Sequence, residues 1–482
     1  MKNPTTIFVG GTTSVRSVHA WSLPSTLALA LFLFAKVAFA GSAMWSAANG
    51  NWNLASNWNP QTVPNGSTDI ATFYRSNTTA ISLSASVGLA ELVFNGDGYT
   101  SYTITVPGQV FYFEGAGITN NSGYTQNFVC NGSGVIEFFN SASAGDQTKF
   151  TGNNGQIYFF DSSNAGSATI TNGPGNIQFS QLSSASTSSI TTKAGCFTQF
   201  DNSATAAGAS LTASSSVSSP AVIYFGDNSN GGTSRIKLVG SNAQLYADSA
   251  PGLTVGSIEG NGTVILGASS LIVGSNNRST TFSGLIQDGT YRSGGQLSKI
   301  GKGSLTLSHA NTYIGGTAVG GGTLLVKNTT GSATGTGTVQ VNSGTLGGTG
   351  SISGPVTIGN GTTKSTILGG TAAAPGNLTI NNMLTLASRS NYKWVLNRTT
   401  MTAGKVTALG VSINNANLTF VPIATGTLAP GTSFTVIDNI SANPIVGTFA
   451  NLPDGEILSS GGITVQANYH GGTGNDLILT VQ

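Results

Sequence analysis

The feature that most constrains the fold of this chain is an imperfect repeat of about 20 residues in its middle. Six segments align on an apolar position that is followed by a small polar stretch. These apolar positions form a first ladder with spacings of 21, 20, 21, 25 and 20 residues: Phe138, Phe159, Phe179, Phe200, Phe225 and Leu245. One such segment cannot bury its apolar edge alone, whereas stacked copies form a continuous core.

A second ladder follows at spacings of 20, 20, 21 and 25 residues: Phe150, Ile170, Ile190, Leu211 and Ile236. The long interval falls at the same place in both ladders, so one loop insertion across the Ser-rich stretch 214–220 explains both. One position before the first ladder stand Glu137, Tyr158, Gln178, Gln199, Tyr224 and Gln244. Because side chains alternate across a strand, we expect the ladders inside and these residues outside.

The ladders predict an all-β fold, namely a right-handed parallel β-helix (β-solenoid) with coils of about 20 residues and capping segments at both ends. The chain contains 67 glycines and shows no sustained helical period. The predicted layout is a signal peptide (1–40), an N-terminal cap with the first coils (41–125), the repeated coils (126–275), a region with a different repeat (276–365) and C-terminal coils with a cap (366–482).

The tetrapeptide GKGS at 301–304 could belong to a nucleotide-binding loop or to a turn between strands. A P-loop needs G-x-x-x-x-G-K-[ST] between a strand and a helix. Here Gln296 stands where the first glycine belongs, Gly303 follows Lys302, and the next residues alternate as a strand. The sequence therefore predicts a turn, with Lys302 at a solvated corner.

The stretch 295–326 resembles the autotransporter-associated β-strand repeat, whose pattern is Lys-x-Gly-x-Gly-x-Leu-x-Leu, then Asn-Thr-Tyr, then Gly-Gly-Thr and Gly-Gly-Thr-Leu. The matching residues are Lys299, Gly301, Gly303, Leu305, Leu307, Asn311, Thr312, Tyr313, Gly315, Gly316, Thr317, Gly321, Gly322, Thr323 and Leu324. The resemblance places this repeat in the region 276–365 and implies a β-helical, exported passenger of a Gram-negative bacterium. A looser similarity to autotransporter passengers extends from about Trp45 to the end of the chain.

An autotransporter passenger is followed by a membrane β-barrel of alternating strands about ten residues long. After Val326, 156 residues remain, and they read as further passenger and a cap. We therefore expect a passenger-like chain without a recognisable C-terminal barrel.

The first 40 residues read as a secretory signal, with Lys2 and Arg16 before the apolar run 27–34 and a small-x-small site that ends at Ala40. The alternative is an uncleaved anchor. Lys36, close after a short apolar run, argues against it, since a spanning helix needs about 20 apolar residues. We expect a mature chain without a membrane span, exported to the periplasm, the cell surface or the medium.

Charged residues make up 7% of the chain, against about 25% in ordinary soluble domains. Three of the 18 Lys and Arg residues lie in the first 40, which leaves 15 basic against 16 acidic residues. A nucleic-acid partner would need clustered Lys and Arg and is therefore not expected. Cys130 and Cys196 fall about three coils apart, roughly 14 Å, so we expect two free, buried thiols.

Trp45, Trp52 and Trp58 crowd the start of the predicted mature chain. Exposed indole rings stack on sugars, so these residues are candidates for glycan binding. They are also suited to plug the open end of a solenoid, because each ring buries about 200 Å² of apolar face. The pattern favours the plug.

GGTGNDLIL at 471–479 fits a calcium-binding nonapeptide once, with Asp476 as the candidate metal ligand. Calcium in such arrays is held between successive copies, so a final turn and strand is the favoured interpretation and no cofactor is expected.

A polar residue follows each of the first five ladder positions by two: Asn140, Asp161, Gln181, Asn202 and Asp227. We expect these residues to stack at a coil corner, where their amides satisfy one another. A metal site or a pair of catalytic acids is the alternative.

The predicted mature chain holds two histidines, His309 and His470, both in turns, and no G-x-S-x-G elbow. No catalytic constellation is found, so the chain is not expected to be an enzyme. The expected function is a secreted or cell-surface structural β-solenoid, with adhesion to surface glycans or other matrix components as a further hypothesis. Two alternatives stay open: a polysaccharide lyase or hydrolase, and a glycan-binding module that uses the N-terminal tryptophans.

Overall fold

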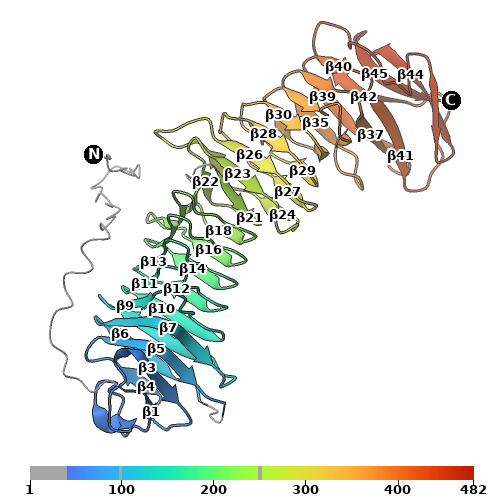
Figure 1. Ribbon diagram of the computed structural model, residues 1–482. Helices are drawn as coiled ribbons and strands as arrows, with labels where there is room; N and C mark the ends of the chain where they lie inside the picture. The colour runs from blue at the N-terminus through green and yellow to red at the C-terminus, as the bar shows by residue number, and fades with distance from the viewer. Residues whose placement is uncertain (1–40, 97–99, 248–251) are drawn as a thin grey trace. The chain divides into compact units, whose positions relative to one another are not determined.

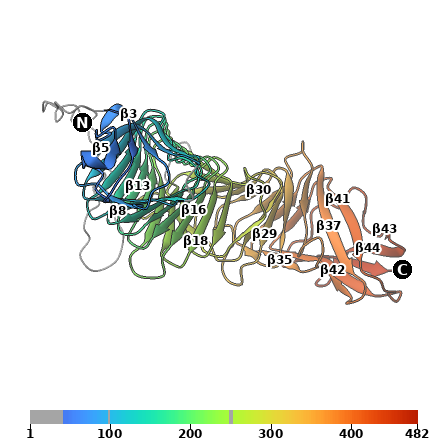
Figure 2. The same ribbon diagram turned by 90° about the horizontal axis from the view of Figure 1, so that it is seen from below.

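Parallel strands stacked in register make up most of the protein, as Figure 1 and Figure 2 show. The structure is a computed structural model that describes residues 41–96, 100–247 and 252–482. These residues belong to one unit, Ala40–Gln482, and the predicted signal peptide (1–40) lies outside them. Within the described ranges the only helical element is the 3-10 turn η1 (Ala55–Asn57). The predicted all-β solenoid is confirmed, while its right-handed sense stays a prediction.

Sheet 1 forms one side of the N-terminal coils. Its strands alternate between buried apolar and half-exposed polar residues, which is the pattern of a sheet with one face on a core. In order of pairing its 13 strands are β2 (Trp58–Asn59), β1 (Ala43–Trp45), β3 (Gly66–Phe73), β5 (Val87–Phe94), β7 (Val110–Asn120), β9 (Val135–Phe138), β11 (Gln156–Phe159), β13 (Asn176–Phe179), β15 (Phe197–Phe200), β17 (Ala221–Phe225), β19 (Ala243–Ala247), β22 (Thr263–Ile265) and β25 (Leu285–Gln287).

Sheet 2 forms a second side and continues through nearly all the coils. Its strands pair in parallel except for the short β38, which pairs antiparallel with β37. They are β4 (Ala80–Ser82), β6 (Thr103–Pro107), β8 (Gln126–Asn131), β10 (Thr148–Asn153), β12 (Thr169–Asn172), β14 (Ser189–Lys193), β16 (Ser210–Ser214), β18 (Arg235–Val239), β21 (Ser257–Gly260), β24 (Thr280–Phe282), β27 (Ser304–Leu307), β29 (Thr323–Val326), β31 (Gly344–Gly348), β34 (Ser365–Ile367), β37 (Ser390–Asn397), β38 (Thr402–Ala403) and β41 (Asn417–Ile423).

Sheets 3 and 4 belong to the C-terminal coils. Sheet 3 contains β20 (Leu253–Val255), β23 (Ser270–Val273), β26 (Gln296–Lys299), β28 (Thr317–Val319), β30 (Val339–Val341), β33 (Val356–Ile358), β36 (Leu384–Leu386) and β40 (Val411–Ile413). Sheet 4 contains β32 (Ser351–Ile352), β35 (Asn377–Ile380), β39 (Lys405–Ala408), β42 (Ser433–Asn439), β45 (Asp476–Val481), β44 (Ile463–Gly471) and β43 (Ile457–Ser460).

The order of the strands along the chain makes many of the coils three-sided. In the N-terminal half, a coil passes from sheet 1 to a column of single parallel bridges and then to sheet 2. That column joins Ser143, Asn164, Ser184, Thr205 and Asn230. From β20 onward a strand of sheet 3 takes the place of the bridge. Sheet 1 ends at β25, the coils from β26 to β31 have strands in sheets 3 and 2 alone, and from β32 onward sheet 4 supplies the third side.

The core consists of stacked rings in register. Along the first ladder, from Phe138 to Phe225, successive rings lie 4.5–4.8 Å apart and within 7° of parallel. The second ladder is confirmed as well, since each of its members pairs with the next in sheet 2. All members of both ladders are buried. This repetition is the apolar core that the sequence pattern requires.

The sixth position of the first ladder is a correction. Phe225 pairs with Ala247, while Leu245 pairs with Ile223, so the alignment of Leu245 with Phe225 was wrong by two residues. The ladder position in this coil is occupied by Ala247, whose side chain is only a methyl group. The nearby Leu245 has a larger apolar side chain and was therefore aligned with Phe225 in its place. A shift of two preserves the inward face, and Leu245 is buried.

Antiparallel pairs cap both ends of the stack. β1 pairs antiparallel with β2 at the N-terminal end. At the other end β43, β44 and β45 form an antiparallel meander, which pairs with β42 through β45. A strand that pairs antiparallel does not continue the parallel coil and so ends the repeat. No helix in the described ranges is long and apolar enough to cross a membrane.

Candidate functional site

The three N-terminal tryptophans lie in the core. Trp45, Trp52 and Trp58 are 5%, 0% and 1% exposed, and the Trp58 ring lies 5.0 Å from Trp45 and 4.8 Å from Trp52 in edge contacts. Each indole N–H donates to a backbone carbonyl: that of Thr78, Pro64 and Trp52, respectively. The rings plug the first coil, and their faces are covered by neighbouring side chains, so a surface for ligands must be sought elsewhere.

The polar ladder at the coil corner is present, but its bonding differs from the expectation. All five residues, from Asn140 to Asp227, have φ between +51° and +59°, a region that Asn and Asp tolerate better than most residues. The side-chain oxygens of the last four accept the backbone N–H of the preceding coil; Asp161 accepts from Asn140 at 2.9 Å, and Asp227 from Asn202 at 3.0 Å. Asn140 Nδ2 instead donates to the carbonyl of Glu114 at 2.8 Å. The ladder therefore pins one coil to the next, mainly through backbone donors rather than through amide pairs.

Asp476 lies inside the C-terminal meander, 8% exposed. Its Oδ1 accepts the backbone N–H of Asn439 at 2.9 Å, and burial raises the pKa of its carboxyl group. The carboxylate thus joins β45 to β42. Among the residues that the structure describes, no three His, Cys, Asp or Glu side chains are grouped so as to hold a metal ion.

The two histidines lie in different parts of the chain. His309 is exposed in the turn after β27. His470 lies in β44, with Nε2 3.7 Å from the carboxylate of Asp454, and both side chains are largely exposed. The prediction that His470 lies in a turn was therefore wrong, because the residue belongs to a strand of the C-terminal cap.

The GKGS tetrapeptide is the predicted turn between β26 and β27, with Gly301 at φ +70° and Lys302 exposed. The neighbouring Lys299, in contrast, is buried, with 1% of its surface exposed. The sequence pattern did not predict this burial. Lys299 Nζ donates to the carbonyls of Ile300 (2.5 Å) and Gly321 (3.3 Å), in successive coils. Burial lowers the pKa of this amine to about 8.

Asn311 and Tyr313 brace the same repeat. Asn311 Oδ1 accepts the N–H of Ile286 at 2.7 Å, while its Nδ2 donates to the carbonyl of Ala333 at 2.5 Å, so one side chain links three coils. The hydroxyl of buried Tyr313 lies 2.6 Å from Oγ1 of Thr317. The polar residues of the repeat thus serve the interior of the stack.

The outward face of sheet 1 carries a different arrangement, which we call the outer strip. It consists of seven side chains at paired positions on consecutive strands from β7 to β19: Tyr112, Glu137, Tyr158, Gln178, Gln199, Tyr224 and Tyr246. All seven are partly exposed. Five of them were expected to point outward, whereas Tyr112 lies before the first aligned segment and Tyr246 replaces Gln244 through the correction above.

Two tyrosine rings of the outer strip lie against glycines. A Cβ added to Gly88 would lie 2.1 Å from Cζ of Tyr112, and one added to Gly226 would lie 2.6 Å from Cε1 of Tyr224. These short distances show that each ring occupies the space over a residue without a side chain. The hydroxyl end of each ring therefore lies over the backbone of the sheet.

Among the polar residues of the outer strip that the structure describes, the two glutamines are held by hydrogen bonds and Glu137 is not. Asp201, beside the strip, accepts Nε2 of Gln199 at 2.7 Å and Nε2 of Gln178 at 3.1 Å. Glu137, between Tyr112 and Tyr158, has no hydrogen-bond or ion-pair partner among the described residues. Burial raises the pKa of the carboxyl groups of Glu137 and Asp201 and the pKa of the hydroxyl groups of Tyr112, Tyr158 and Tyr246.

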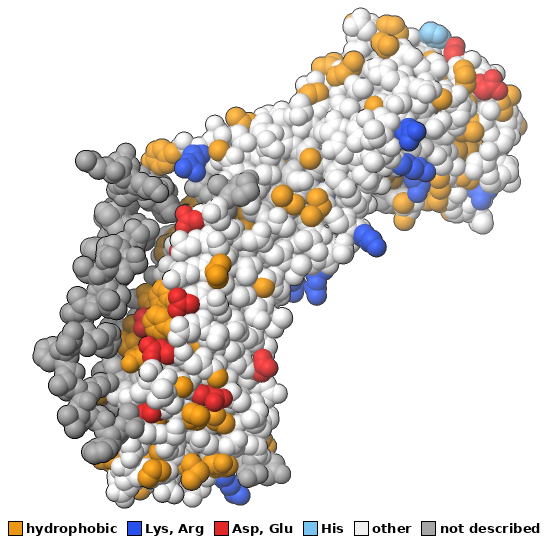
Figure 3. Space-filling model, viewed as in Figure 1, with side chains coloured by type: hydrophobic (Ala, Val, Ile, Leu, Met, Phe, Trp, Pro, Cys, Tyr) orange, Lys and Arg blue, Asp and Glu red, His pale blue; other side chains and the backbone are white. Residues whose placement is uncertain are grey.

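In the coils of the outer strip, the strands of sheet 1 carry acidic residues and the strands of sheet 2 carry basic residues. The strands of sheet 1 contain no Lys or Arg but carry Glu91, Glu114 and Glu137. The basic residues of the same coils stand on sheet 2, at Lys149, Lys193, Arg235 and Lys237. Figure 3 shows acidic and apolar side chains next to one another on the flank where Figure 1 places β9, β11 and β13. The face around the strip is therefore aromatic and anionic.

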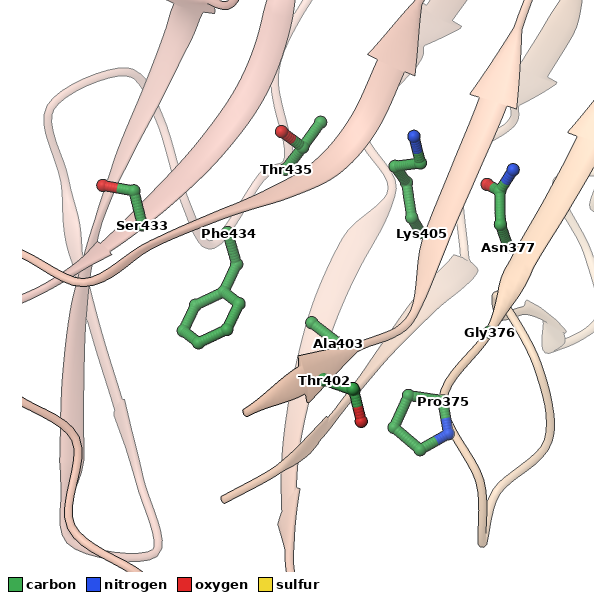
Figure 4. A pocket seen from close by; sticks show the side chains of 9 residues that line it. All are labelled: Pro375, Gly376, Asn377, Thr402, Ala403, Lys405, Ser433, Phe434 and Thr435. Atoms are coloured by element: carbon green, nitrogen blue, oxygen red, sulfur yellow. The ribbon is translucent and has the colours of Figure 1, made fainter. Parts of the chain in front are cut away.

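A hollow of about 460 Å³ lies near the C-terminal cap, between β35, β38, β39 and β42. In Figure 4 the ring of Phe434 and the amine of Lys405 point in opposite directions from their strands. Lys405 Nζ is paired with the carboxylate of Asp438 at 2.7 Å. The hollow is open, and its cation is already neutralised by the protein, so it offers less for a ligand than the outer strip does.

Residues 297–326 match the family model described as passenger-associated-transport-repeat. A comparison with curated proteins gives no match. The matched segment, 30 of 482 residues, runs from β26 to the end of β29, which is about one and a half coils of the stack. The repeat and the stacked parallel coils around it together fit an autotransporter-passenger-like repeat protein.

Proposed function

We propose that this chain is an exported structural protein, a passenger-like β-solenoid that works at the cell surface. The observation that carries the proposal is the passenger-associated repeat at 297–326, built into an uninterrupted parallel stack. Such a stack lengthens by adding coils, each stabilised by its neighbours, and so provides a long scaffold without a single large core. The low charge of the chain suits a scaffold that contacts polar, uncharged material.

Fractionation of the native cells tests the location. Antibodies against the chain should detect it in the outer-membrane or medium fraction, and protease added to intact cells should digest it. A cytoplasmic protein in the same sample should survive. Retention of the chain in the cytoplasmic fraction, protected from the protease, would contradict the proposal.

Adhesion is a second candidate function, and the outer strip favours it. The outward residues of β12 and β14 include small polar side chains such as Thr169, Thr171 and Thr191. The outer strip instead places four tyrosines in one register column. Aromatic side chains on a protein surface are enriched at sites of recognition.

A further inference from the structure

We propose that the outer strip binds a linear, uncharged glycan laid along the stack of coils. The inference rests on the proposed adhesive role and names its ligand class. The occupant follows from three properties of the strip: the spacing of its side chains, the way its rings lie, and the sign of its charge.

The spacing matches a polymer. Seven paired positions on consecutive strands repeat at about 4.8 Å and together span roughly 29 Å. In a linear polysaccharide, the length of one sugar unit along the chain is similar to this spacing between strands. Successive sugars can therefore contact successive coils. A compact small molecule would use only one or two of these positions.

The rings are placed for stacking. Tyr112 and Tyr224 lie over Gly88 and Gly226, where no Cβ lifts them from the sheet. A ring held flat keeps one apolar face outward and its hydroxyl at the edge, and this combination suits the apolar face and hydroxyl rim of a sugar. Tyr158 adds a third ring to the strip, with its centroid 5.8 Å from that of Phe160 in a tilted contact.

The polar groups between the rings suit hydroxyl ligands. Asp201 holds the amides of Gln178 and Gln199 in place, and Gln178 Nε2 also donates to Oγ of Ser180 at 3.1 Å. The amide oxygens are thus the groups that the two side chains offer to a ligand as acceptors. Glu137 stands between Tyr112 and Tyr158 as an acceptor that the described protein leaves unused. Sugar hydroxyls are donors, so they can satisfy these acceptors.

The charge of the strip excludes acidic polymers. Sheet 1 supplies carboxylates and no Lys or Arg, so uronates, sulfated glycans and nucleic acids would meet like charge without a counter-ion. An uncharged glycan is the linear polymer that fits both the rings and the carboxylates.

Calorimetric titration of the purified full chain tests the proposal. The probes are cellohexaose, laminarihexaose and maltohexaose as uncharged chains, with hexagalacturonate as an acidic chain of the same length. We expect at least one uncharged probe to bind and hexagalacturonate not to bind. Tyr158→Ala should weaken binding about tenfold, and Gly88→Ala, which pushes the Tyr112 ring off the sheet, should weaken it as well.

Tyr291→Ala is the matched control, because Tyr291 is 71% exposed on the loop between β25 and β26, outside the strip. It should bind as the wild type does, and all variants should melt at wild-type temperatures. Failure of every uncharged probe, equal binding of hexagalacturonate, or wild-type affinity in both strip variants would each overturn the proposal. Titration uses purified protein, so its failure is distinct from a failure of the fractionation experiment.

Discussion

At the scale of the residue, neighbours in sequence have opposite roles in this fold. Phe159 is fully buried between Phe138 and Phe179, with centroids 4.8 Å and 4.5 Å away, while Tyr158 belongs to the outer strip. A slip of one residue in register would exchange the two faces. The pair therefore provides an internal control for the register of β11.

Phe159→Ala should lower the free energy of unfolding by about 3–5 kcal/mol, because it removes a large buried ring and leaves a cavity. Tyr158→Ala should cost less than about 1 kcal/mol, since most changes at partly exposed positions are small. Urea denaturation of both variants measures the difference. Equal costs would mean that the register is wrong by one residue.

Lys299 should make stability depend on pH. Its pKa is lowered to about 8 in the folded protein, against about 10.4 in an unfolded chain. Between these values the unfolded chain binds more protons, so the free energy of unfolding should rise with pH, by at most about 3 kcal/mol. Below about pH 8 the amine is charged in both states and this gain is absent.

Lys299→Met removes the titrating group and should flatten this part of the pH profile. The difference between wild type and variant, measured by denaturation from pH 7 to pH 10.5, isolates the lysine from the tyrosines, which titrate in both proteins. Parallel profiles would show that the buried amine keeps its ordinary pKa.

The two cysteines should be unreactive in the folded protein. Cys130 and Cys196 are free and buried, and burial raises the pKa of the Cys130 thiol to about 11. A thiol reagent at pH 8 should therefore label both slowly, and both quickly in denaturant, because the thiolate is the nucleophile. Fast labelling of either residue in the native protein would contradict its place in the core.

At the scale of the element, the coils are fastened to one another by side chains that bond to backbone groups. The corner ladder does this in the N-terminal half, while Lys299 and Asn311 do it in the repeat at 297–326. Hydrogen bonds of this kind fix the register of adjacent coils, because each side chain bonds to one particular backbone group of the neighbouring coil. A shift of one coil along the other would break the bond.

Asn311→Ala should cost about 2–4 kcal/mol, since it leaves the buried N–H of Ile286 and the carbonyl of Ala333 without partners. Hydrogen exchange should quicken near Ile286 and Ala333. Thr312→Ala is the control: its side chain is exposed, and the change should stay within about 0.5 kcal/mol. Equal effects of the two substitutions would contradict the bracing role of Asn311.

The sequence predicted the elements well where apolar side chains repeat. The Phe ladder and the second ladder were correctly placed on strands because each coil repeats the same large apolar residue at the same height. The prediction was wrong at Leu245, where the ladder continues through Ala247, and a methyl group gives little signal.

The outer strip could be predicted only in part. Alternation placed five of its members on the outer face, but the contacts of Tyr112 with Gly88 and of Tyr224 with Gly226 depend on three-dimensional register between coils. The burial of Lys299 was not predictable from pattern, because a lysine next to glycines is usually solvated. The three tryptophans, in contrast, were correctly expected to plug the first coil.

At the scale of the whole molecule, the central claim is that the described chain is a stack of coils, each stabilised by its neighbours. Contacts between strands are almost all between one coil and the next. In such a stack, damage to one coil spreads only to its neighbours, whereas a single globular core loses its protection as one unit.

Hydrogen exchange with mass spectrometry on Phe159→Ala tests this claim most directly. We predict faster exchange between about residues 135 and 180, where Phe159 and its two neighbours stack, and unchanged protection in the repeat at 297–326. Wild type and Tyr158→Ala should both keep protection in the two regions. Loss of protection along the whole chain in Phe159→Ala would contradict the stack of coils and would show one cooperative core instead.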